Sequence, residues 1–542
     1  MRKRRDKMKK RILSFALAVL MIASLLPVSA SADNTDAVGG TCGEALEWTL
    51  KDGVLTISGT GEMYDYNYYD NTSPWSGARS KIVDVVLDDG ITKIGSGAFY
   101  DCNSLRSISI PNSVTRISYG AFLYCDSLRS ANIPSGVTSI EGQTFSGCGA
   151  LESVTIPNSV TYIGAEAFAD CRSLESVVIP EGVTYIDFAA FTRCRRLKSV
   201  SLPDSLTNIE WEAFYSCESL EDITIPGNVT YIGGRAFSYC GIKSLNIPAS
   251  LNRFNRGMIE GCDKLEVINV SDDNQEFSSV NGVLYNKDKT EIKVYPEGAA
   301  QEAYSIPEGV THISYRAFED CTNLKTIDIP SSVTGIGFSA FYHCTGLESI
   351  YIPDSVEAMD GINGIFERCD NLKAINVGEN NQAFSSVNGV LYSKDKTQLW
   401  LAPAGLEQES YKVPNGVTEI SYYAFRDCTK LKSVSLPEGL THIDDCAFAY
   451  SGLESINIPD SVAYISWAAF RNTNLETITI SEGVKYVAIT NYFEDGAFEG
   501  CNKLKAINVS ENNQYYSSDN GALYNKEKTE LLLIPRAFEH ES

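Results

Sequence analysis

The residue types best suited to chemistry in this 542-residue chain are its fifteen cysteines and four histidines. The histidines fall at no interval typical of a metal site or a catalytic triad, and no C-x-x-C, G-x-S-x-G or H-E-x-x-H motif occurs. The sequence therefore predicts no catalytic residue, no metal site and no cofactor, and we expect the protein not to be an enzyme. The four histidines are His312, His343, His442 and His540.

Thirteen of the cysteines share one position, three residues after a recurring aromatic residue or its replacement. A secreted protein normally invites a disulfide interpretation of such a pattern. Ser451 and Thr473 nevertheless replace the cysteine in two repeats, which indicates that the position needs a small, semi-polar side chain. We predict a ladder of buried thiols, with Cys42 and Cys446 outside it. The ladder positions are Cys102, Cys125, Cys148, Cys171, Cys194, Cys217, Cys240, Cys262, Cys321, Cys344, Cys369, Cys428 and Cys501.

Two further patterns have both a chemical and a structural interpretation. The run Ser393 to Lys396 has the form S-x-x-K of some acyl-transfer enzymes, but Asn286 and Asn525 stand at the serine position in two sister segments, so we attribute the match to chance. Three acidic segments offer oxygen ligands for Ca²⁺ without the spacing of a complete calcium loop, so turn formation is the favoured interpretation. These segments are Asp272-Asp273-Asn274, Glu379-Asn380-Asn381 and Glu511-Asn512-Asn513.

The cysteine positions belong to a repeat of 23 residues with the form A-F-x-x-C-x-x-L-x-x-I-x-I-P-x-x-V-T-x-I. Its L-x-x-I-x-I part predicts a short strand that the proline ends, and its V-T-x-I part predicts a second short strand or extended turn. No window has a sustained 3.6-residue period, so helices of one turn at most are expected at the corners. The sequence predicts a mostly β solenoid of about fifteen coils with a parallel sheet. Its first phenylalanines are Phe99, Phe122, Phe145, Phe168, Phe191, Phe214 and Phe237.

Three β-hairpins interrupt the coils, each predicted from two strand patterns around a polar turn, at 281–296, 388–403 and 520–535. Before the coils, Trp48 to Ile57 predicts another hairpin around Asp52-Gly53, in a β cap that covers the first coil. Tyr64, Tyr66, Tyr68 and Tyr69 are expected to pack this cap on that coil. The predicted organisation is a signal peptide (1–32), the N-terminal β cap (33–95), repeat block 1 (96–266), insert 1 (267–304), repeat block 2 (305–373), insert 2 (374–410), repeat block 3 (411–505), and insert 3 with the C-terminus (506–542).

The N-terminus has eight basic residues before an apolar run from Ile12 to about Leu26, followed by Ala30-Ser31-Ala32. This order is typical of a secretory signal peptide. Its removal changes the formal net charge from −24 to −31. A strongly acidic protein is a poor partner for nucleic acid, and no later segment is apolar enough to span a bilayer. We expect a secreted or cell-surface protein with no transmembrane segment after cleavage.

The coil pattern over roughly residues 90–535 resembles the BspA-like, bacterial surface type of leucine-rich repeat. The opening run Gly40-Thr41-Cys42-Gly43 with Trp48-Thr49-Leu50 is similar to the segment that precedes such arrays in secreted proteins of gut bacteria. The resemblance implies a leucine-rich-repeat solenoid without catalytic residues. It also implies the role known for some members, which is adhesion to host matrix proteins or to other microbes.

The residue after the strand leucine is charged in every coil, and neighbouring coils often carry opposite signs. We predict a ladder of exposed ion pairs there, each contributing only a few tenths of a kcal/mol. The column is Arg106, Arg129, Glu152, Glu175, Lys198, Glu221, Lys243, Glu266, Lys325, Glu348, Lys373, Lys432, Glu454, Glu476 and Lys505. The outward positions of the strand itself are mostly Ser, Thr and Asn, interrupted by Asp328 and Tyr351, which favours a scaffold over a tailored pocket.

Aromatic residues gather instead at the variable position of V-T-x-I and two residues past its isoleucine, where a core does not require them. One interpretation is an exposed binding surface for a protein partner or for stacking on sugar rings; the other is that the rings lie flat over corner residues and shield the stack. The candidate surface is Tyr119, Tyr162, Tyr185, Phe188, Trp211, Tyr231, Tyr315, Phe338, Tyr422, Tyr464, Trp467 and Tyr486.

The sequence favours a non-enzymatic adhesin or protein-recognition scaffold whose partner is an extracellular protein of a host matrix or of another microbe. Many weak contacts along an extended surface give avidity without a deep pocket. The alternative is a carbohydrate-binding solenoid that assists polysaccharide capture.

Overall fold

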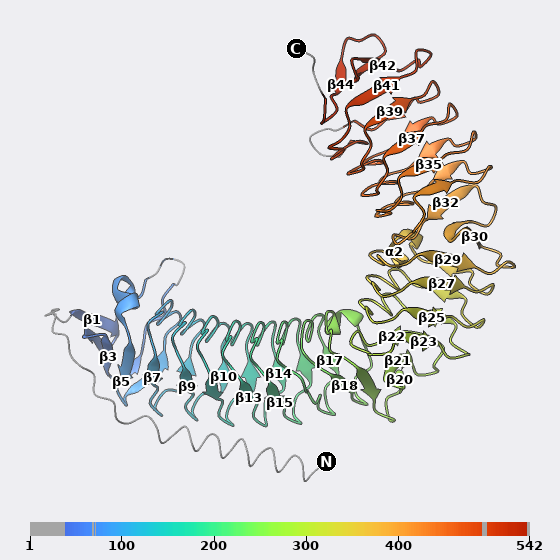
Figure 1. Cartoon of the computed structure of the whole chain (residues 1–542). Helices are drawn as coiled ribbons and strands as arrows, with labels where there is room; N and C mark the ends of the chain where they lie inside the picture. The colour runs from blue at the N-terminus through green and yellow to red at the C-terminus, as the bar shows by residue number, and fades with distance from the viewer. Residues whose placement is uncertain (1–37, 68–69, 71, 490–495, 539–542) are drawn as a thin grey trace.

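The computed structural model describes residues 38–67, 70, 72–489 and 496–538. The predicted signal peptide at 1–32, together with Tyr68, Tyr69 and His540, lies outside these residues. The described chain winds into one long solenoid, whose N-terminal arm (blue to green) bends in the green part into a C-terminal arm (yellow to red) (Figure 1). The predicted mostly β solenoid is confirmed.

The N-terminal cap is a small antiparallel sheet of β1 (Val38–Gly43), β2 (Leu46–Lys51) and β3 (Val54–Gly59). The predicted hairpin is confirmed: Trp48 faces Ile57 across the ladder, and Asp52 and Gly53 both have positive φ (51° and 81°), as a type I′ turn requires. The last cap strand then pairs in parallel with β5 (Asp84–Leu87), and β5 pairs with β7 (Ser107–Ser109). The cap therefore covers the open edge of the first coil.

Trp75 closes the core at the N-terminal end. Its ring stacks on Phe99 with centroids 5.9 Å apart, and its indole N–H donates to the carbonyl of Ala98 at 2.8 Å. Tyr66 packs edge-on against Trp75 and donates its hydroxyl to the carbonyl of Cys42, as the sequence predicted for part of the tyrosine patch. Tyr64 remains exposed, so the expectation that it packs the cap is wrong.

Most coils contribute two short strands to parallel ladders, as predicted, with partners usually 23 residues apart. Asp222 forms only isolated bridges, and residues 251–255 form no strand. The first ladder consists of several separate parallel sheets along the solenoid. Its strands after β7 are β9 (Ser130–Asn132), β11 (Ser153–Thr155), β13 (Ser176–Val178), β15 (Ser199–Ser201), β18 (Ser244–Ile247), β19 (Val267–Val270), β23 (Ala303–Ser305), β25 (Thr326–Asp328), β27 (Ser349–Ile352), β29 (Ala374–Val377), β33 (Ser410–Lys412), β35 (Ser433–Ser435), β37 (Ser455–Asn457), β39 (Thr477–Ile480) and β41 (Ala506–Val509).

The second ladder is built from the V-T-x-I segments and lies on another side of each coil. Its strands are β4 (Gly61–Glu62), β6 (Ile91–Ile94), β8 (Arg116–Ile117), β10 (Ser139–Ile140), β12 (Tyr162–Ile163), β14 (Tyr185–Ile186), β16 (Asn208–Ile209), β17 (Tyr231–Ile232), β24 (His312–Ile313), β26 (Gly335–Ile336), β28 (Ala358–Met359), β34 (Glu419–Ile420), β36 (His442–Ile443), β38 (Tyr464–Ile465) and β40 (Tyr486–Val487).

The core consists of stacked identical side chains. Successive phenylalanines are fully or almost fully buried, with ring centroids 5.1 to 5.7 Å apart. Beside them, ten of the ladder cysteines donate from Sγ to a phenylalanine carbonyl of the preceding coil, for example Cys125 to Phe99 at 3.1 Å. Cys321 and Cys428 donate to the carbonyls of Tyr295 and Ala402 at the equivalent place. Ser451 and Thr473 donate in the same region to Phe448 and Phe470. The ladder position therefore needs a small hydrogen-bond donor, which Cys, Ser and Thr all supply.

All fifteen cysteines lie in the described part of the chain and are thiols there. Burial raises the pKa of the Cys102 thiol to about 12 and that of Cys344 well above its usual range. We expect the native protein to resist a maleimide reagent at pH 7.5, because a buried thiol is neither accessible nor ionised. In denaturant without reductant, most cysteines are expected to react. Mass spectrometry of the labelled protein checks this, and cysteines that stay unlabelled after denaturation would contradict the thiol ladder.

The corners of the coils contain left-handed residues and very little helix. In each regular coil of the first block, the residues two before and two after the phenylalanine have positive φ, as Glu212 (57°) and Ser216 (56°) do around Phe214. The helices are η1 (Ser76–Lys81), η2 (Arg256–Ile259) and α2 (Ile362–Ile365). The first spans two 3₁₀ turns, which is longer than the single turn expected. Within the described ranges, none of these helices has the length and apolarity to cross a membrane.

Each insert contains the predicted hairpin and one further strand that the sequence analysis missed. In the first, β21 (Val283–Asn286) and β22 (Glu291–Val294) form the hairpin, and β20 (Phe277–Val280) pairs antiparallel with β21. The second has β30 (Phe384–Val387), β31 (Val390–Ser393) and β32 (Gln398–Leu401); the third has β42 (Tyr516–Asp519), β43 (Ala522–Asn525) and β44 (Leu531–Leu533). Because β22 and β32 pair in parallel with β24 and β34, the last strand of these inserts restarts the second ladder.

A buried charge cluster joins the first block to the second. The guanidinium of Arg256 contacts the carboxylate of Glu297 and lies 3.8 Å from Glu319 Oε2. All three side chains are at most 5% exposed. Arg316 adds a second cation, 3.0 Å from Glu319 and 3.9 Å from Glu260. Glu260 also lies 3.9 Å from Arg235, so its charge is shared between two arginines at the edge of the cluster.

The burial of Glu319 gives the protein a specific pH dependence. Burial is the main cause that raises the pKa of Glu319 to about 7. Because the folded state holds this proton more tightly than the unfolded chain, the stabilisation from Glu319 is complete below about pH 4.5 and is lost as the pH rises to about 7. Glutamine has no carboxyl to titrate, so we expect Glu319→Gln to remove this part of the dependence of stability on pH. Melting temperatures of both proteins from pH 4.5 to 8 check this expectation. If the two proteins show the same change of melting temperature with pH, Glu319 is not the group responsible.

Candidate binding surface

The tyrosines at the variable position of V-T-x-I stand in a column on the second ladder. Parallel pairing places Tyr162 beside Tyr185, and Tyr231 follows beyond Asn208. The rings of Tyr162 and Tyr185 stack with centroids 6.0 Å apart. Hydrogen bonds fix them from one side, since Tyr162 donates to the carboxylate of Asp187. Burial, followed by the hydrogen bond to Glu210, raises the pKa of Tyr185 to about 12.

The second aromatic column, two residues past the isoleucine, both shields the coils and stays exposed. A Cβ added to Gly142, Gly234 or Gly361 would lie only 2.9, 2.6 or 2.3 Å from an aromatic ring of the preceding coil, so each ring rests on a glycine of the next coil. The rings are those of Tyr119, Trp211 and Phe338, which nevertheless remain 41%, 51% and 47% exposed. These rings therefore shield the corner of the next coil with one face and leave part of their surface exposed.

In the N-terminal arm the two columns meet in what we call the first-arm patch, formed by Tyr162, Tyr185, Phe188, Trp211 and Tyr231. The indole N–H of Trp211 donates to the hydroxyl of Tyr231 at 3.0 Å, which links the columns. Phe188, Trp211 and Tyr231 are exposed, while Tyr162 and Tyr185 are half-buried. These rings present a broad apolar surface whose side chains are already ordered.

The remaining predicted residues lie in smaller groups further along the array. Tyr315 and Phe338 stack 6.2 Å apart in the second block. In the third block Tyr422 lies against Tyr423, Trp467 is only half-exposed, and Tyr486 is exposed beside Tyr464 on the second ladder. His442, which the sequence analysis did not select, stacks on Tyr464 with centroids 4.8 Å apart. The predicted residues therefore form separate groups, because the inserts interrupt the coils between them.

Other surfaces have structural explanations. The charged column forms the predicted exposed ion pairs, such as Lys198 with Glu175 at 3.1 Å and Lys243 with Glu221 at 2.8 Å. Ser393 of the S-x-x-K match donates to Asp395 within its own turn and accepts from the N–H of Gln398. Ser393 therefore stabilises its own turn.

The acidic segments contribute a buried asparagine, not a calcium loop. The side-chain amide of Asn274 donates to the carbonyls of Pro248 and Leu251, and its oxygen accepts from the N–H groups of Glu276 and Phe277. Asn381 and Asn513 do the same in the other inserts. Turn formation is confirmed, and across the described residues no group of three or more His, Cys, Asp or Glu side chains is arranged to hold a metal ion.

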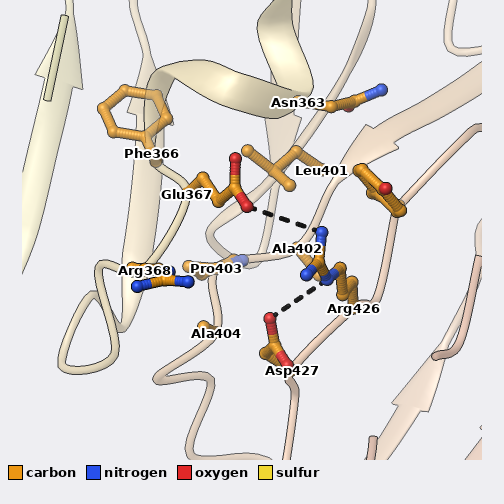
Figure 2. Close-up of a pocket in the computed structure, with 11 residues that line it drawn as sticks. Asn363, Phe366, Glu367, Arg368, Leu401, Ala402, Pro403, Ala404, Arg426 and Asp427 are labelled. Atoms are coloured by element: carbon orange, nitrogen blue, oxygen red, sulfur yellow. Dashed lines mark ion pairs between the residues drawn. The ribbon is translucent and has the colours of Figure 1, made fainter. Parts of the chain in front are cut away.

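One hollow was not predicted. It lies at the second insert, where Asn363, Glu367, Arg368, Ala404 and Arg426 surround a small pocket (Figure 2). A second, wider hollow of about 380 Å³ shares Arg368, Arg426 and Asp427 with this pocket and is also lined by His343, Asp370 and Tyr450. The only sequence signal for it is the break in the repeat at Ala402-Pro403-Ala404, where the phenylalanine and the following corner residues are missing.

Comparisons with known proteins agree with this architecture. A model of the BspA type leucine rich repeat region matches residues 78–198, 138–266, 186–297, 291–388 and 404–530. No curated protein matches the chain significantly. Among solved structures, a leucine-rich repeat protein from Eubacterium ventriosum is 25% identical, with 85% of this chain and 98% of that chain covered and a TM-score of 0.35. One from Bacteroides ovatus is 24% identical (86% and 99% covered, TM-score 0.36), and a leucine rich cell surface protein from Faecalibacterium prausnitzii is 24% identical (89% and 96% covered, TM-score 0.35).

Proposed function

Because the chain belongs to the BspA-type leucine-rich repeat family, we propose that it is a non-enzymatic recognition scaffold that acts outside the cell as an adhesin for a protein partner. The signal-peptide pattern and the similarity to a protein described as a cell surface protein support this location. A rigid array offers its exposed residues at fixed spacing, so several weak contacts act together.

The first-arm patch is the observation that carries this proposal. Protein interfaces are enriched in Tyr, Trp and Phe because their rings bury a large area with little loss of side-chain entropy. Phe188, Trp211 and Tyr231 keep 44%, 51% and 37% of their surface exposed. The hydrogen bond between Trp211 and Tyr231 holds these two rings in place before a partner arrives, which reduces the entropy lost on binding.

The experiment compares the mature protein with a Tyr185→Ala, Trp211→Ala double variant on arrays of extracellular matrix proteins and glycans. We expect binding to a matrix protein that weakens at least tenfold in the double variant. A Tyr315→Ala, Phe338→Ala variant in the second block is the matched control and is expected to bind as the unchanged protein does. Matrix binding that is insensitive to the first pair would place the site elsewhere. Saturable glycan binding that the first pair abolishes would replace the proposal by a carbohydrate-binding solenoid.

A further inference from the structure

The three inserts place different residues at one equivalent position. After the last insert strand, Gly298, Gly405 and Ala537 each donate a backbone N–H to a leucine carbonyl, at 2.9, 3.0 and 2.9 Å. The preceding residues are therefore equivalent: Glu297 in the first insert, Ala404 in the second and Arg536 in the third. Glu297 is buried against Arg256, and Arg536 pairs with Glu499. Only Ala404 brings no charged group to this position.

In the first insert, a carboxylate occupies this position for a clear physical reason. Glu297 accepts the N–H of Gly261 at 3.2 Å and balances the guanidinium of Arg256. Gly261 is the left-handed residue before the ladder cysteine, and Arg368 is its equivalent at the second insert, with a φ of 61°. The backbone of the second insert therefore has the form that holds a carboxylate in the first.

The charged side chains around Ala404 have also changed places: two arginines are gained, while Asn363 and Tyr423 stand where the first insert has Arg256 and Arg316. Arg426 stands where the first insert has Glu319, and Arg368 stands where it has glycine. Arg426 lies 3.5 Å from Glu367 and 3.4 Å from Asp427, which is longer than a good charge-assisted hydrogen bond. In the part of the chain that the structure describes, Asn363 Oδ1 is buried without a hydrogen-bond partner, and the buried Arg426 Nε has only the 3.4 Å approach to Asp427. Figure 2 shows these side chains around Ala404.

The groups that line the wider hollow are better suited to binding the hydroxyl groups of a ligand than to binding a second charged group. Asp370 and Asp427 offer carboxylate acceptors, and His343 lies on the same side. Tyr450 offers an aromatic ring that is 41% exposed, with the guanidinium groups of Arg426 and Arg471 each 5.9 Å from its centroid. The volume of about 380 Å³ lies in the range of small-molecule sites. A metal ion is disfavoured by the arginines, and a simple anion leaves the acceptors and the ring unused.

We propose that this hollow binds a sugar acid, with the sugar carboxylate in the place that Glu297 fills in the first insert. Arg426 and the N–H and side chain of Arg368 hold the carboxylate. Asp370 and Asp427 accept hydrogen bonds from the hydroxyls, and Tyr450 packs on the ring face. The site is separate from the first-arm patch and is independent of the protein partner proposed for that patch.

Calorimetric titration of the mature protein tests the proposal with three pairs of probes: galacturonic acid and galactose, glucuronic acid and glucose, and N-acetylneuraminic acid and N-acetylmannosamine. We expect one acid at least to bind ten times more tightly than its neutral counterpart. Acetate and a glutamate-containing dipeptide are expected to bind at least tenfold more weakly than that acid.

Two variants locate the site. Ala404→Glu supplies the missing carboxylate from the chain itself, so it is expected to abolish sugar-acid binding while the melting temperature stays the same or rises. Arg426→Gln is expected to weaken binding at least tenfold, whereas Arg235→Gln, an exposed corner arginine of the first block, is expected to have no effect. The proposal is overturned by equal affinity for acid and neutral sugars, by dipeptide or acetate binding as tight as the acid, or by binding that survives Ala404→Glu.

Discussion

Replacing Arg256 by methionine is expected to destabilise the junction between the first and second blocks by about 3–5 kcal/mol at pH 8, the range for removing one partner of a buried ion pair. The guanidinium is the only group that contacts Glu297 and also lies within 4 Å of Glu319 among the described ion pairs. Without it, two carboxylates remain buried with only Arg316 nearby. The loss of Arg256 is destabilising because a buried carboxylate costs free energy unless a cation and hydrogen bonds compensate its charge.

Two features separate this effect from a simple loss of packing. First, the destabilisation is expected to be smaller at pH 5.5, because burial already raises the pKa values of Glu297 and Glu319 and protonated carboxyls need no cation. Second, a further Glu297→Met change is expected to restore part of the lost stability, since an apolar pair often replaces a buried ion pair without cost. The second insert already lacks both groups, with Asn363 and Ala404 in their places.

Hydrogen exchange measured by mass spectrometry is the suitable test, because a solenoid opens locally and need not unfold in one step. Peptides that cover 251–270 and 291–320 are expected to exchange faster in Arg256→Met, while peptides from the third block keep their rates. Arg253→Met, an exposed arginine three residues earlier, is the matched control, with an expected change within about 0.5 kcal/mol. Equal protection in all three proteins would show that the cluster does not join the blocks.

The coil architecture was predictable because it repeats. A phenylalanine, a cysteine and five aliphatic residues recur at fixed spacing, and stacking is the way in which each coil buries them. The need for a small, semi-polar side chain at the cysteine position was also predictable, because Ser451 and Thr473 replace cysteine there and keep a hydrogen-bond donor. Trp75 was not recognised as the first rung of the core, because it lies 24 residues before Phe99 and has no alanine before it.

The inserts and the second-insert hollow were less predictable. Strand β20 contains Phe277 and Val280 around two serines, a pattern too short to separate from a loop. The hollow exists because Ala404 has a small side chain where the first insert has Glu297. The sequence does not show that these positions are equivalent, because the buried contact of Glu297 is known only from the structure. The sequence left open whether the aromatic positions are an exposed surface or a shield, and their division into groups depends on the inserts, which a repeat pattern alone does not place in space.

The second large effect is expected from Asn381, the buried asparagine before β30. Its amide group makes four hydrogen bonds: two to the carbonyls of Pro353 and Val356, and two from the N–H groups of Ala383 and Phe384. Asn381→Leu has a similar volume but removes these four hydrogen bonds from a buried site, and of the four backbone groups the Pro353 carbonyl keeps another partner, the N–H of Val356. Because each unpaired group costs about 1–3 kcal/mol and the backbone relaxes in part, we expect a loss of about 3–5 kcal/mol.

Asn381→Asp separates hydrogen bonding from packing. Its carboxylate still accepts from the two N–H groups but repels the two carbonyls, so the variant is expected to be destabilised at pH 7 and to recover part of its stability near pH 4, where a protonated acid can donate to one carbonyl. Asn380→Ala, at the exposed neighbouring position, is expected to change stability by less than about 1 kcal/mol. Exchange of peptides from 353–393 is the measurement. If Asn381→Leu protects these peptides as well as asparagine does, shape alone holds the insert on the solenoid, and the three equivalent asparagines are not the hydrogen-bonded anchors of the inserts.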